Sequence, residues 1–254
     1  MRWIYNGVFV LLVAHFAYVY VVPDRSLLSD VNIVYWLAFD HELDRSVLQE
    51  DYVITGGDRM LLRGGDDVSL HFDLMDGALE PERISRHGAM RGPASPDERD
   101  SAVMVSADEA DRWLPNGERV MVVHKADEVR AYPIPLLERQ PVINDRIGEE
   151  PILVVHGSIA DFTGVFRRKV GGEELQFALT GYMYFDPEVA QGYRIPLLWD
   201  VATRSLWWPP HRQAGTGPLQ GKPLEPYAES FESTWRQAKQ EHPHINVLGR
   251  DRLR

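Results

Sequence analysis

With 254 residues, of which 44% are hydrophobic and 26% charged, the chain has the composition of an ordinary globular protein, which excludes collagen, a coiled coil and a polytopic membrane protein. Its 27 basic and 38 acidic side chains give a net charge of −11, so it lacks the positive surface of a sequence-independent nucleic-acid-binding protein, and we expect no nucleic-acid partner. It contains no cysteine, which excludes disulfides, thiolate metal ligands and cysteine nucleophiles.

The first predicted element is an apolar run over residues 3–22 that contains no charged side chain. A helix of this length extends about 30 Å, which matches the hydrocarbon core of a bilayer. Aromatic side chains such as Trp3 and Tyr18 stand at both ends, as in a membrane-interface belt, and Pro23 follows the run. We therefore expect residues 1–22 to form a transmembrane anchor in contact with the lipid bilayer.

A cleaved signal peptide is the alternative to an anchor. Its best cleavage point, after Ala17, has the bulky His15 two residues earlier, where a small residue is preferred. Arg2 and the terminal amine precede the run, whereas Asp24 and Arg25 cancel after it. The positive-inside rule then predicts a single-pass protein whose body lies outside the cytoplasm.

His15 is the one ionisable side chain within the predicted span. Ionisable residues are costly inside a membrane and are functional candidates by default. A neutral imidazole there can ligate the metal of a tetrapyrrole, or it can donate a hydrogen bond to a neighbouring helix. Both interpretations of His15 stay open, and the rest of the chain predicts no cofactor.

Residues 23–82 are expected to form a membrane-proximal helix followed by β-hairpins. A helix is predicted within residues 26–49, and its apolar run, which includes Tyr35 and Trp36, is too short to cross a bilayer. This run lies either on the membrane surface, against a partner helix, or in the core of the soluble body. Three short β-type runs follow, separated by two Gly-Gly-Asp turns, at residues 52–55, 60–62 and 68–72.

Residues 83–254 contain closely spaced short strands and few long helices, which indicates a mainly β (α+β) body. A short helix over residues 106–114 begins with a capping box formed by Ser106 and Glu109. A final helix is predicted over residues 230–240. Strands are predicted at residues 119–125, 128–132, 152–156, 165–170 and 175–180.

Several segments of this body follow one another in an order that is typical of a known family. They are Arg130-Ala131-Tyr132-Pro133, Val142-Ile143-Asn144-Asp145, Gly164-Val165-Phe166 with Arg168, Thr203 with Ser205-Leu206-Trp207, Gly217-Pro218-Leu219, Trp235 and His242-Pro243. Together they resemble the bacterial and archaeal domain of unknown function 3179 family, over a region from about residue 83 to about residue 248. The resemblance implies the fold of that family and does not by itself imply an activity.

The chain departs from the family pattern where chemistry is expected. Family members typically carry a Tyr-Cys-Pro-Leu-Cys-Gly-Thr segment, and here Gly157 and Ala160 stand at the two cysteine positions. A family Asn-Trp-His-Glu segment is replaced at residues 138–141, and a polar Asn-Ser pair becomes Phe185-Asp186, followed by an insertion over residues 187–194. The resemblance therefore implies that the chain keeps the scaffold of the family and has lost the site that depends on the cysteine pair.

Two groups of polar residues remain as candidates for chemistry. Ser158 lies between His156 and Asp161, but triad residues are seldom this close in sequence and no Gly-x-Ser-x-Gly elbow is present, so a solvated loop is favoured. His242 and His244 have a spacing that lets two histidines share a metal, but no third ligand lies nearby in the sequence. We expect neither a catalytic group nor a metal.

Aromatic side chains cluster in the C-terminal third of the chain. Trp199, Trp207 and Trp208, with Tyr193, form either an exposed surface for a partner or, for at least two of them, part of the core.

The sequence as a whole favours a non-catalytic accessory subunit whose partners are integral membrane protein subunits. Respiratory and photosynthetic complexes are natural hosts for such a subunit. The expected partner contacts are Trp3, Tyr18, Tyr35, Trp36 and Tyr193. One alternative is a periplasmic enzyme or small-ligand-binding protein with a re-invented site, which requires two or more of His156, Asp161, Asn144 and Asp145 within hydrogen-bond reach. Another is a cell-envelope module that binds a small ligand through its aromatic side chains.

Overall fold

The computed structural model describes residues 52–56, 59–64, 68–75, 77–86, 102–189 and 194–250. The chain divides into two compact units, residues 1–48 and 49–254, and the described residues all belong to the second. Among these residues there is no helix of the length and apolar character needed to cross a bilayer. The predicted anchor and the predicted helix within residues 26–49 lie outside them.

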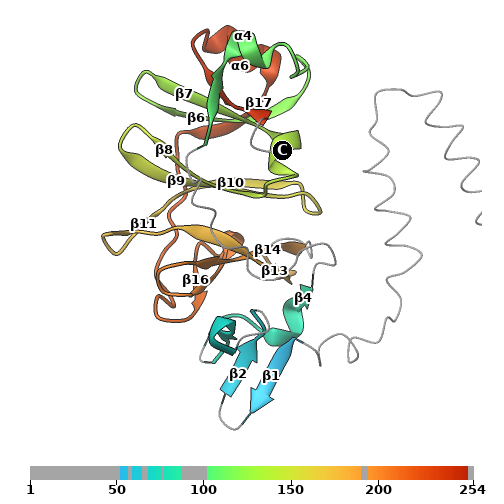
Figure 1. The fold of residues 1–254 in the computed structure, drawn as a ribbon, viewed down its shortest axis with the longest axis vertical. Coiled ribbons are helices and arrows are strands. Elements are labelled where there is room, and N and C mark those ends of the chain that lie inside the picture. Colours follow the sequence, from blue (N-terminus) through green and yellow to red (C-terminus); the bar gives the residue numbers. More distant parts are fainter. Residues whose placement is uncertain are drawn as a thin grey trace, which may run out of the picture. The chain divides into compact units, whose positions relative to one another are not determined.

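The second unit is mainly β, as the sequence predicts, and three of its sheets form most of it (Figure 1). The first, here called the helix-covered sheet, has the strand order β17 (Ser230–Thr234), β6 (Arg119–Lys125), β7 (Glu128–Pro133), β18 (Asn246–Leu248) and β5 (Met104–Ser106). The middle sheet has the order β10 (Phe162–Arg167), β9 (Glu150–Gly157) and β8 (Val142–Ile147). The tryptophan sheet has the order β16 (Gln213–Thr216), β15 (Leu206–Trp208), β14 (Arg194–Asp200), β13 (Phe177–Phe185) and β4 (Ile84–Arg86).

Smaller elements complete the unit. The N-terminal sheet contains β1 (Val53–Gly56), β2 (Arg59–Leu62) and β3 (Phe72–Asp73), and a hairpin contains β11 (Lys169–Val170) and β12 (Glu173–Glu174). The helices are α4 (Ala107–Ala110), α5 (Ile134–Leu137) and α6 (Trp235–Glu241), with 3-10 turns η1 (Val68–Leu70), η2 (Pro81–Arg83) and η3 (Pro209–His211).

The middle sheet is buried on both faces. Successive side chains of a strand point to opposite faces, so Ile152 and Val154 of β9 belong to one core cluster while Leu153 and Val155 belong to another. The first cluster includes residues of the helix-covered sheet, such as Tyr132, and the second includes residues of the tryptophan sheet. The uninterrupted apolar run of β9 therefore has the pattern of a strand that lies between two other layers.

The outer faces of the stack are covered by other elements. Trp235 and Ala238 of α6 pack with Val120 and Val122 of β6, so helices cover the outer face of the helix-covered sheet. On the tryptophan sheet, Tyr184 and Trp208 share a core cluster with Leu62 and Phe72 of the N-terminal sheet. Residues on both sides of the expected boundary between 82 and 83 thus contribute to one core.

Most of the predicted strands are confirmed, including β6 with its predicted bounds. Ser106 caps α4 as predicted, because its Oγ accepts a hydrogen bond from the Glu109 N–H at 3.3 Å. The helix predicted over residues 230–240 is wrong in its first half, because β17 pairs with β6 and the helix begins only after Thr234, whose Oγ1 accepts from the Gln237 N–H.

The strand predicted over residues 68–72 is also wrong in its first part. Residues Val68–Leu70 form the turn η1, which leaves Ser69 and Leu70 exposed and lets Phe72 and Leu74 enter the core.

Candidate functional site

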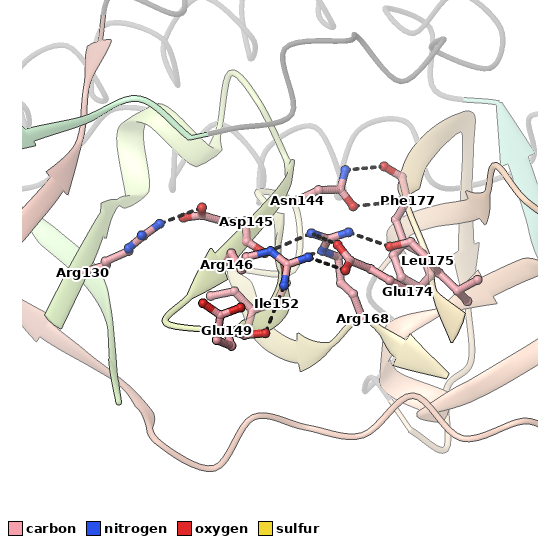
Figure 2. A network of polar contacts seen from close by, with 10 residues as sticks. All are labelled: Arg130, Asn144, Asp145, Arg146, Glu149, Ile152, Arg168, Glu174, Leu175 and Phe177. Atoms are coloured by element: carbon pink, nitrogen blue, oxygen red, sulfur yellow. Dashed lines mark hydrogen bonds and ion pairs between the residues drawn. The ribbon is translucent and has the colours of Figure 1, made fainter. Parts of the chain in front are cut away.

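Asp145 on β8 is the most deeply buried carboxylate among the residues that carry the family resemblance, with 5% of its surface exposed. Its Oδ1 accepts a hydrogen bond from Arg130 Nη1 at 2.7 Å (Figure 2), and its Oδ2 accepts one from the Tyr132 hydroxyl at 2.6 Å. Burial and the adjacent carboxylate hold the pKa of Tyr132 well above its usual range, so this hydroxyl stays a donor. Asp145 therefore fastens the middle sheet to β7.

Asn144, the preceding residue, fastens the middle sheet to the layer on its other side. Its Nδ2 donates to the Phe177 carbonyl at 2.8 Å, and its Oδ1 accepts from the Phe177 N–H at 2.8 Å (Figure 2). One amide side chain thus binds both main-chain groups of a residue on β13. Because neighbouring strand residues point to opposite faces, Asn144 and Asp145 together tie β8 to both adjacent sheets.

Arg168, just after β10, binds main-chain carbonyls of three segments. Its Nε donates to Ile152 at 2.8 Å, its Nη1 to Leu175 at 2.6 Å and its Nη2 to Asp145 at 3.1 Å (Figure 2). Nη2 also lies 3.3 Å from a carboxylate oxygen of Glu174 on β12. Arg168 is buried, so its guanidinium holds together β8, β9 and the segment that precedes β13 rather than facing a solvent-filled site.

The Thr-x-Ser-Leu-Trp segment organises the turn between β14 and β15 around a fully buried Asp200. The Asp200 carboxylate accepts hydrogen bonds from the Thr203 N–H at 2.7 Å and from Trp207 Nε1 at 2.9 Å. Ser205 Oγ accepts from the Leu219 N–H at 2.9 Å. Gly217 has a φ of +83° there, and a Cβ at this position would lie 2.7 Å from the Cα of Ser205, so only glycine fits.

The replaced segment forms the hairpin between β9 and β10. His156 is 1% exposed, and its Nδ1 lies 3.0 Å from Thr163 Oγ1. Burial lowers the pKa of His156 below its ordinary value, although the negative charge of Asp161 opposes the shift. The imidazole is therefore neutral at pH 7 and is satisfied by a neighbour on the paired strand.

Asp161, at the tip of the same hairpin, binds an arginine of β6. Both of its carboxylate oxygens lie 2.8 Å from Arg119 Nη1, and Arg119 Nη2 lies 2.7 Å from a carboxylate oxygen of Glu232. Within the described residues no hydrogen bond joins His156 to Asp161. The re-invented-site hypothesis requires two or more of Asn144, Asp145, His156 and Asp161 within hydrogen-bond reach. Each of these side chains has a partner outside that set.

The positions of the family's cysteine pair lie in this hairpin. Gly157 ends β9, and a Cβ built on it would lie 3.1 Å from Pro196 Cδ and 3.6 Å from Ile195 Cγ2, so a larger side chain requires Pro196 to shift by a few tenths of an ångström. Ala160 lies in the turn between the strands. A methyl group and a hydrogen atom therefore stand where the family pattern places two thiols.

A shallow groove of about 650 Å³ lies beside this hairpin. Its lining includes Ala160 and Asp161 of the turn and Thr163 of β10. Further lining residues are mainly apolar, among them Phe162, Val165, Pro209, Pro226 and Tyr227. Arg212 and Asp161 are its charged lining residues. The groove thus offers an apolar wall with few polar groups.

A second polar cluster lies at the position of the family's Asn-Ser pair. Asp186 Oδ2 lies 3.0 Å from His211 Nε2, and Asp186 Oδ1 lies 3.1 Å from Arg83 Nη1. The hydrogen bond from His211 is the main cause of a lowered pKa for the Asp186 carboxyl. This cluster joins η2 and η3 to the end of β13.

Within the part of the chain that the structure describes, no group of three or more histidine and carboxylate side chains is arranged to hold a metal ion. The main chain of His242 instead ends α6, because its N–H donates to the Ala238 carbonyl at 2.9 Å. Its own carbonyl accepts from the Ile245 N–H at 3.0 Å.

The three tryptophans near the C-terminal third are core residues, which confirms that alternative. Trp207 and Trp208 are fully buried and Trp199 is 7% exposed. Trp207 packs edge-on against Phe177 with ring centroids 5.5 Å apart. The other candidates lie outside the described residues: His15, Trp3, Tyr18, Tyr35, Trp36 and Tyr193.

A protein-family model described as a protein of unknown function (DUF3179) matches residues 97–253. The chain belongs to the DUF3179 family. The resemblance stated from the motifs is thereby confirmed. No curated protein matches the chain, and no solved structure matches it. The DUF3179 name carries no activity, so the contacts described above are the basis for any functional argument.

The roles of the motif residues extend beyond what the sequence predicted. Asp200 and Asp111 were not singled out, yet Asp200 binds Trp207 and Asp111 Oδ1 accepts from Trp235 Nε1 at 2.7 Å. Each of these carboxylates pairs with a tryptophan of the DUF3179 pattern, and a buried indole N–H usually has an acceptor. The only available signal was the presence of those tryptophans, which does not identify the acceptor.

Proposed function

We propose that this DUF3179 protein is a non-catalytic accessory subunit of a bacterial membrane protein complex. In this proposal residues 1–22 anchor it in the inner membrane and the β body lies on the periplasmic side. The observation that carries the proposal is the use of the polar motif residues: Asn144, Asp145 and Arg168 bind other parts of the fold, while Gly157 and Ala160 replace the reactive pair. A stable body without a reactive cluster suits a protein that positions partners.

The alternative of a periplasmic enzyme or ligand-binding protein has less support. It requires polar groups that converge on a concave site. The groove beside the β9–β10 hairpin is lined mainly by apolar residues, and its Asp161 is already bound to Arg119. The buried His156 pairs with Thr163 and does not line that groove.

The proposal is tested by gentle solubilisation of native membranes. The tagged full chain is purified in mild detergent, companions are quantified by mass spectrometry, and an absorption spectrum of the eluate is recorded. We expect integral membrane companions in fixed stoichiometry with the chain. An unrelated tagged single-pass protein from the same membranes is the control for companions captured by the tag or the detergent.

The same experiment can also contradict the subunit proposal. A chain that elutes alone, as a stable and colourless monomer, would overturn the subunit proposal. A pigment band that disappears on His15→Ala would instead assign a tetrapyrrole to the anchor, and an unchanged band would exclude His15 as its ligand.

A further inference from the structure

The β17 edge of the helix-covered sheet carries main-chain groups that no other described strand covers. β17 stands first in the strand order of that sheet and pairs only with β6. Two hydrogen bonds just beyond its ends fix how its main chain alternates. The Glu229 carbonyl accepts from the His124 N–H at 3.0 Å, and the Trp235 N–H donates to the Glu118 carbonyl at 2.8 Å. The odd-numbered residues of β17 therefore bond to β6, and the even-numbered residues direct their main-chain groups outward.

The outward residues are Ser230, Glu232 and Thr234. Within the described ranges, the main-chain N–H and C=O of Ser230 and Glu232 have no main-chain partner, and neither has the N–H of Thr234. An uncovered strand edge of this kind is a template for pairing with another chain.

Two other sheets of the molecule have edge strands that are covered by irregular segments. On β10 of the middle sheet, the Arg167 N–H donates to the Glu225 carbonyl at 2.8 Å. On β16 of the tryptophan sheet, the Ala214 N–H donates to the Lys222 carbonyl at 2.9 Å. The fold thus covers these edges with its own chain and leaves β17 without such a cover.

β17 also lacks the features that usually protect an exposed edge. Its five residues contain no proline, and its register with β6 has no bulge. Its one charged side chain is Glu232, whose carboxylate lies 2.7 Å from Arg119 Nη2 on β6. This carboxylate therefore leans toward the paired strand rather than guarding the open edge.

An apolar ring lies beside the open edge. Phe231 is 37% exposed, and its ring packs edge-on against His124 with centroids 6.3 Å apart. It stands opposite Val122, which belongs to the core cluster under α6, so Phe231 lies on the helix-covered face of the sheet. A chain that pairs with β17 can cover this ring.

The sequence of β17 is complementary to itself in one antiparallel register. If Phe231 stands opposite Phe231 of a second copy, Ser230 stands opposite Glu232, and Glu229 stands opposite Ser233. This register pairs two aromatic rings and places no like charges opposite one another, both of which favour cross-strand pairing. A shift one way opposes the two Glu232 carboxylates, and a shift the other way places Phe231 opposite Glu229. Complementarity of charge and apolar surface thus selects a second copy of the chain in the Phe231-centred register.

We propose that two copies of this chain associate by antiparallel pairing of β17, about a twofold axis at Phe231. The outward main-chain groups of Ser230 and Glu232 in each copy supply the hydrogen bonds, and the two Phe231 rings cover one another. The two five-stranded helix-covered sheets then become one continuous sheet. The contact uses the same surface on both copies, as a twofold interface requires. This dimer goes beyond the proposed subunit function and does not depend on it.

The first test is the mass of the full chain in mild detergent, measured by light scattering over a range of protein concentrations. We expect a dimer that dissociates on dilution. Phe231→Lys places two like charges opposite one another at the axis, and we expect it to raise the dissociation constant at least about tenfold. Val103→Lys is the matched control, because Val103 is a 53% exposed apolar residue next to β5 at the opposite edge of the same sheet. We expect that variant to dimerise as the wild type does.

Single cysteines test the register, because the chain has no cysteine of its own. Opposite residues of a non-hydrogen-bonded antiparallel pair have Cα atoms about 4.5 Å apart, which is within the range of a disulfide. We therefore expect Phe231→Cys to give a covalent dimer with oxidised glutathione. Ser233→Cys should give none, because the two copies of that residue lie about 13 Å apart along the strands. A mixture of Ser233→Cys and Glu229→Cys should again cross-link.

Three results would overturn the proposal. One is a chain that stays monomeric at every concentration. Another is a dimer that is unaffected by Phe231→Lys and is not cross-linked by Phe231→Cys, which would place the contact elsewhere in the chain. The third is a covalent dimer of Ser233→Cys without one of Phe231→Cys, which would contradict the register. None of these results concerns companions, so the subunit proposal stands or fails by co-purification alone.

Discussion

Two regions of this DUF3179 body differ in how firmly they are held. The residues that carry the family resemblance, such as Asn144, Asp145 and Arg168, are buried and bind two adjacent sheets. The hairpin of residues 156–162, which replaces the family's cysteine segment, ends in an exposed Asp161 bound to an exposed Arg119. The recognisable motifs of this chain therefore contain residues that bind the sheets to one another. A shared motif is weak evidence for a shared activity.

The difference arises from the position of the middle sheet. A strand between two layers has no solvent for its buried polar groups, so each buried polar side chain on β8 must find a partner within the protein. The β9–β10 turn lies at the end of the same sheet and reaches solvent, where residues can change at little cost.

The largest effect is expected for Asp145→Ala. The change leaves the buried Tyr132 hydroxyl without its acceptor and leaves the Arg130 guanidinium with Glu128 alone, so we expect the free energy of unfolding to fall by about 3–5 kcal/mol. Urea unfolding of the full chain in mild detergent, followed by tryptophan fluorescence, measures it. Arg146→Ala is the matched control on β8, because its ion pair with Glu174 is 45% and 41% exposed and contributes less than about 1 kcal/mol. Equal losses in both variants would contradict the assignment.

A somewhat smaller loss is expected for Asn144→Ala. Two main-chain groups of Phe177 lose their partners in a buried environment, and we expect the free energy of unfolding to fall by about 2–4 kcal/mol. Asn144→Asp keeps an acceptor for the Phe177 N–H but not a donor for its carbonyl, and it therefore tests the two bonds separately. Wild-type stability of Asn144→Ala would show that β8 and β13 are held by apolar packing alone.

Changes at the lost cysteine positions are expected to cost less. Gly157→Ala requires Pro196 to shift by a few tenths of an ångström, so we expect a loss of about 1 kcal/mol in the same unfolding assay. The double change Gly157→Cys with Ala160→Cys should then give a folded protein with two titratable thiols. A variant that does not fold would mean that the hairpin can no longer accommodate the family's pair.

The smallest effect is a pH dependence caused by His156. Its pKa in the folded chain is below the value of about 6.5 in the unfolded chain, so the unfolded chain binds the proton first as the pH falls. Stability from this group is therefore complete above about pH 6.5 and declines below it. Unfolding curves between about pH 5 and pH 7.5 should show this decline in the wild type and a smaller one in His156→Gln. The same slope in both proteins would remove His156 as the cause.

The sequence predicts the local elements of this body better than its long-range contacts. The alternation and turn residues around β6 and β7 were sufficient to place those strands. The hydrogen bonds between Asn144 and Phe177 join residues 33 positions apart, and no local pattern specifies such a pair. The error at residues 230–234 has the same origin, because that segment becomes a strand only by pairing with β6.

From the sequence, the candidate site could be predicted only as the place where the family's two cysteines are replaced. Comparison with the family pattern located the replaced positions at Gly157 and Ala160, and the structure places both in one hairpin. The groove next to it could not be foreseen, because it is lined by residues from β10, from η3 and from the segment around Pro226. A groove forms where segments that are distant in the sequence pack side by side, and a local sequence pattern does not specify that packing.

We propose that the fold has been kept as a scaffold while the hairpin carries no chemistry. The most direct test compares the full chain with the double variant His156→Gln, Ser158→Ala, both isolated from native membranes in mild detergent. We predict that the double variant retains its companions in wild-type stoichiometry and unfolds at a similar urea concentration at pH 7.5. Loss of companions, or loss of any activity of the complex, by a variant of unchanged stability would contradict the claim and would identify the hairpin as a functional site.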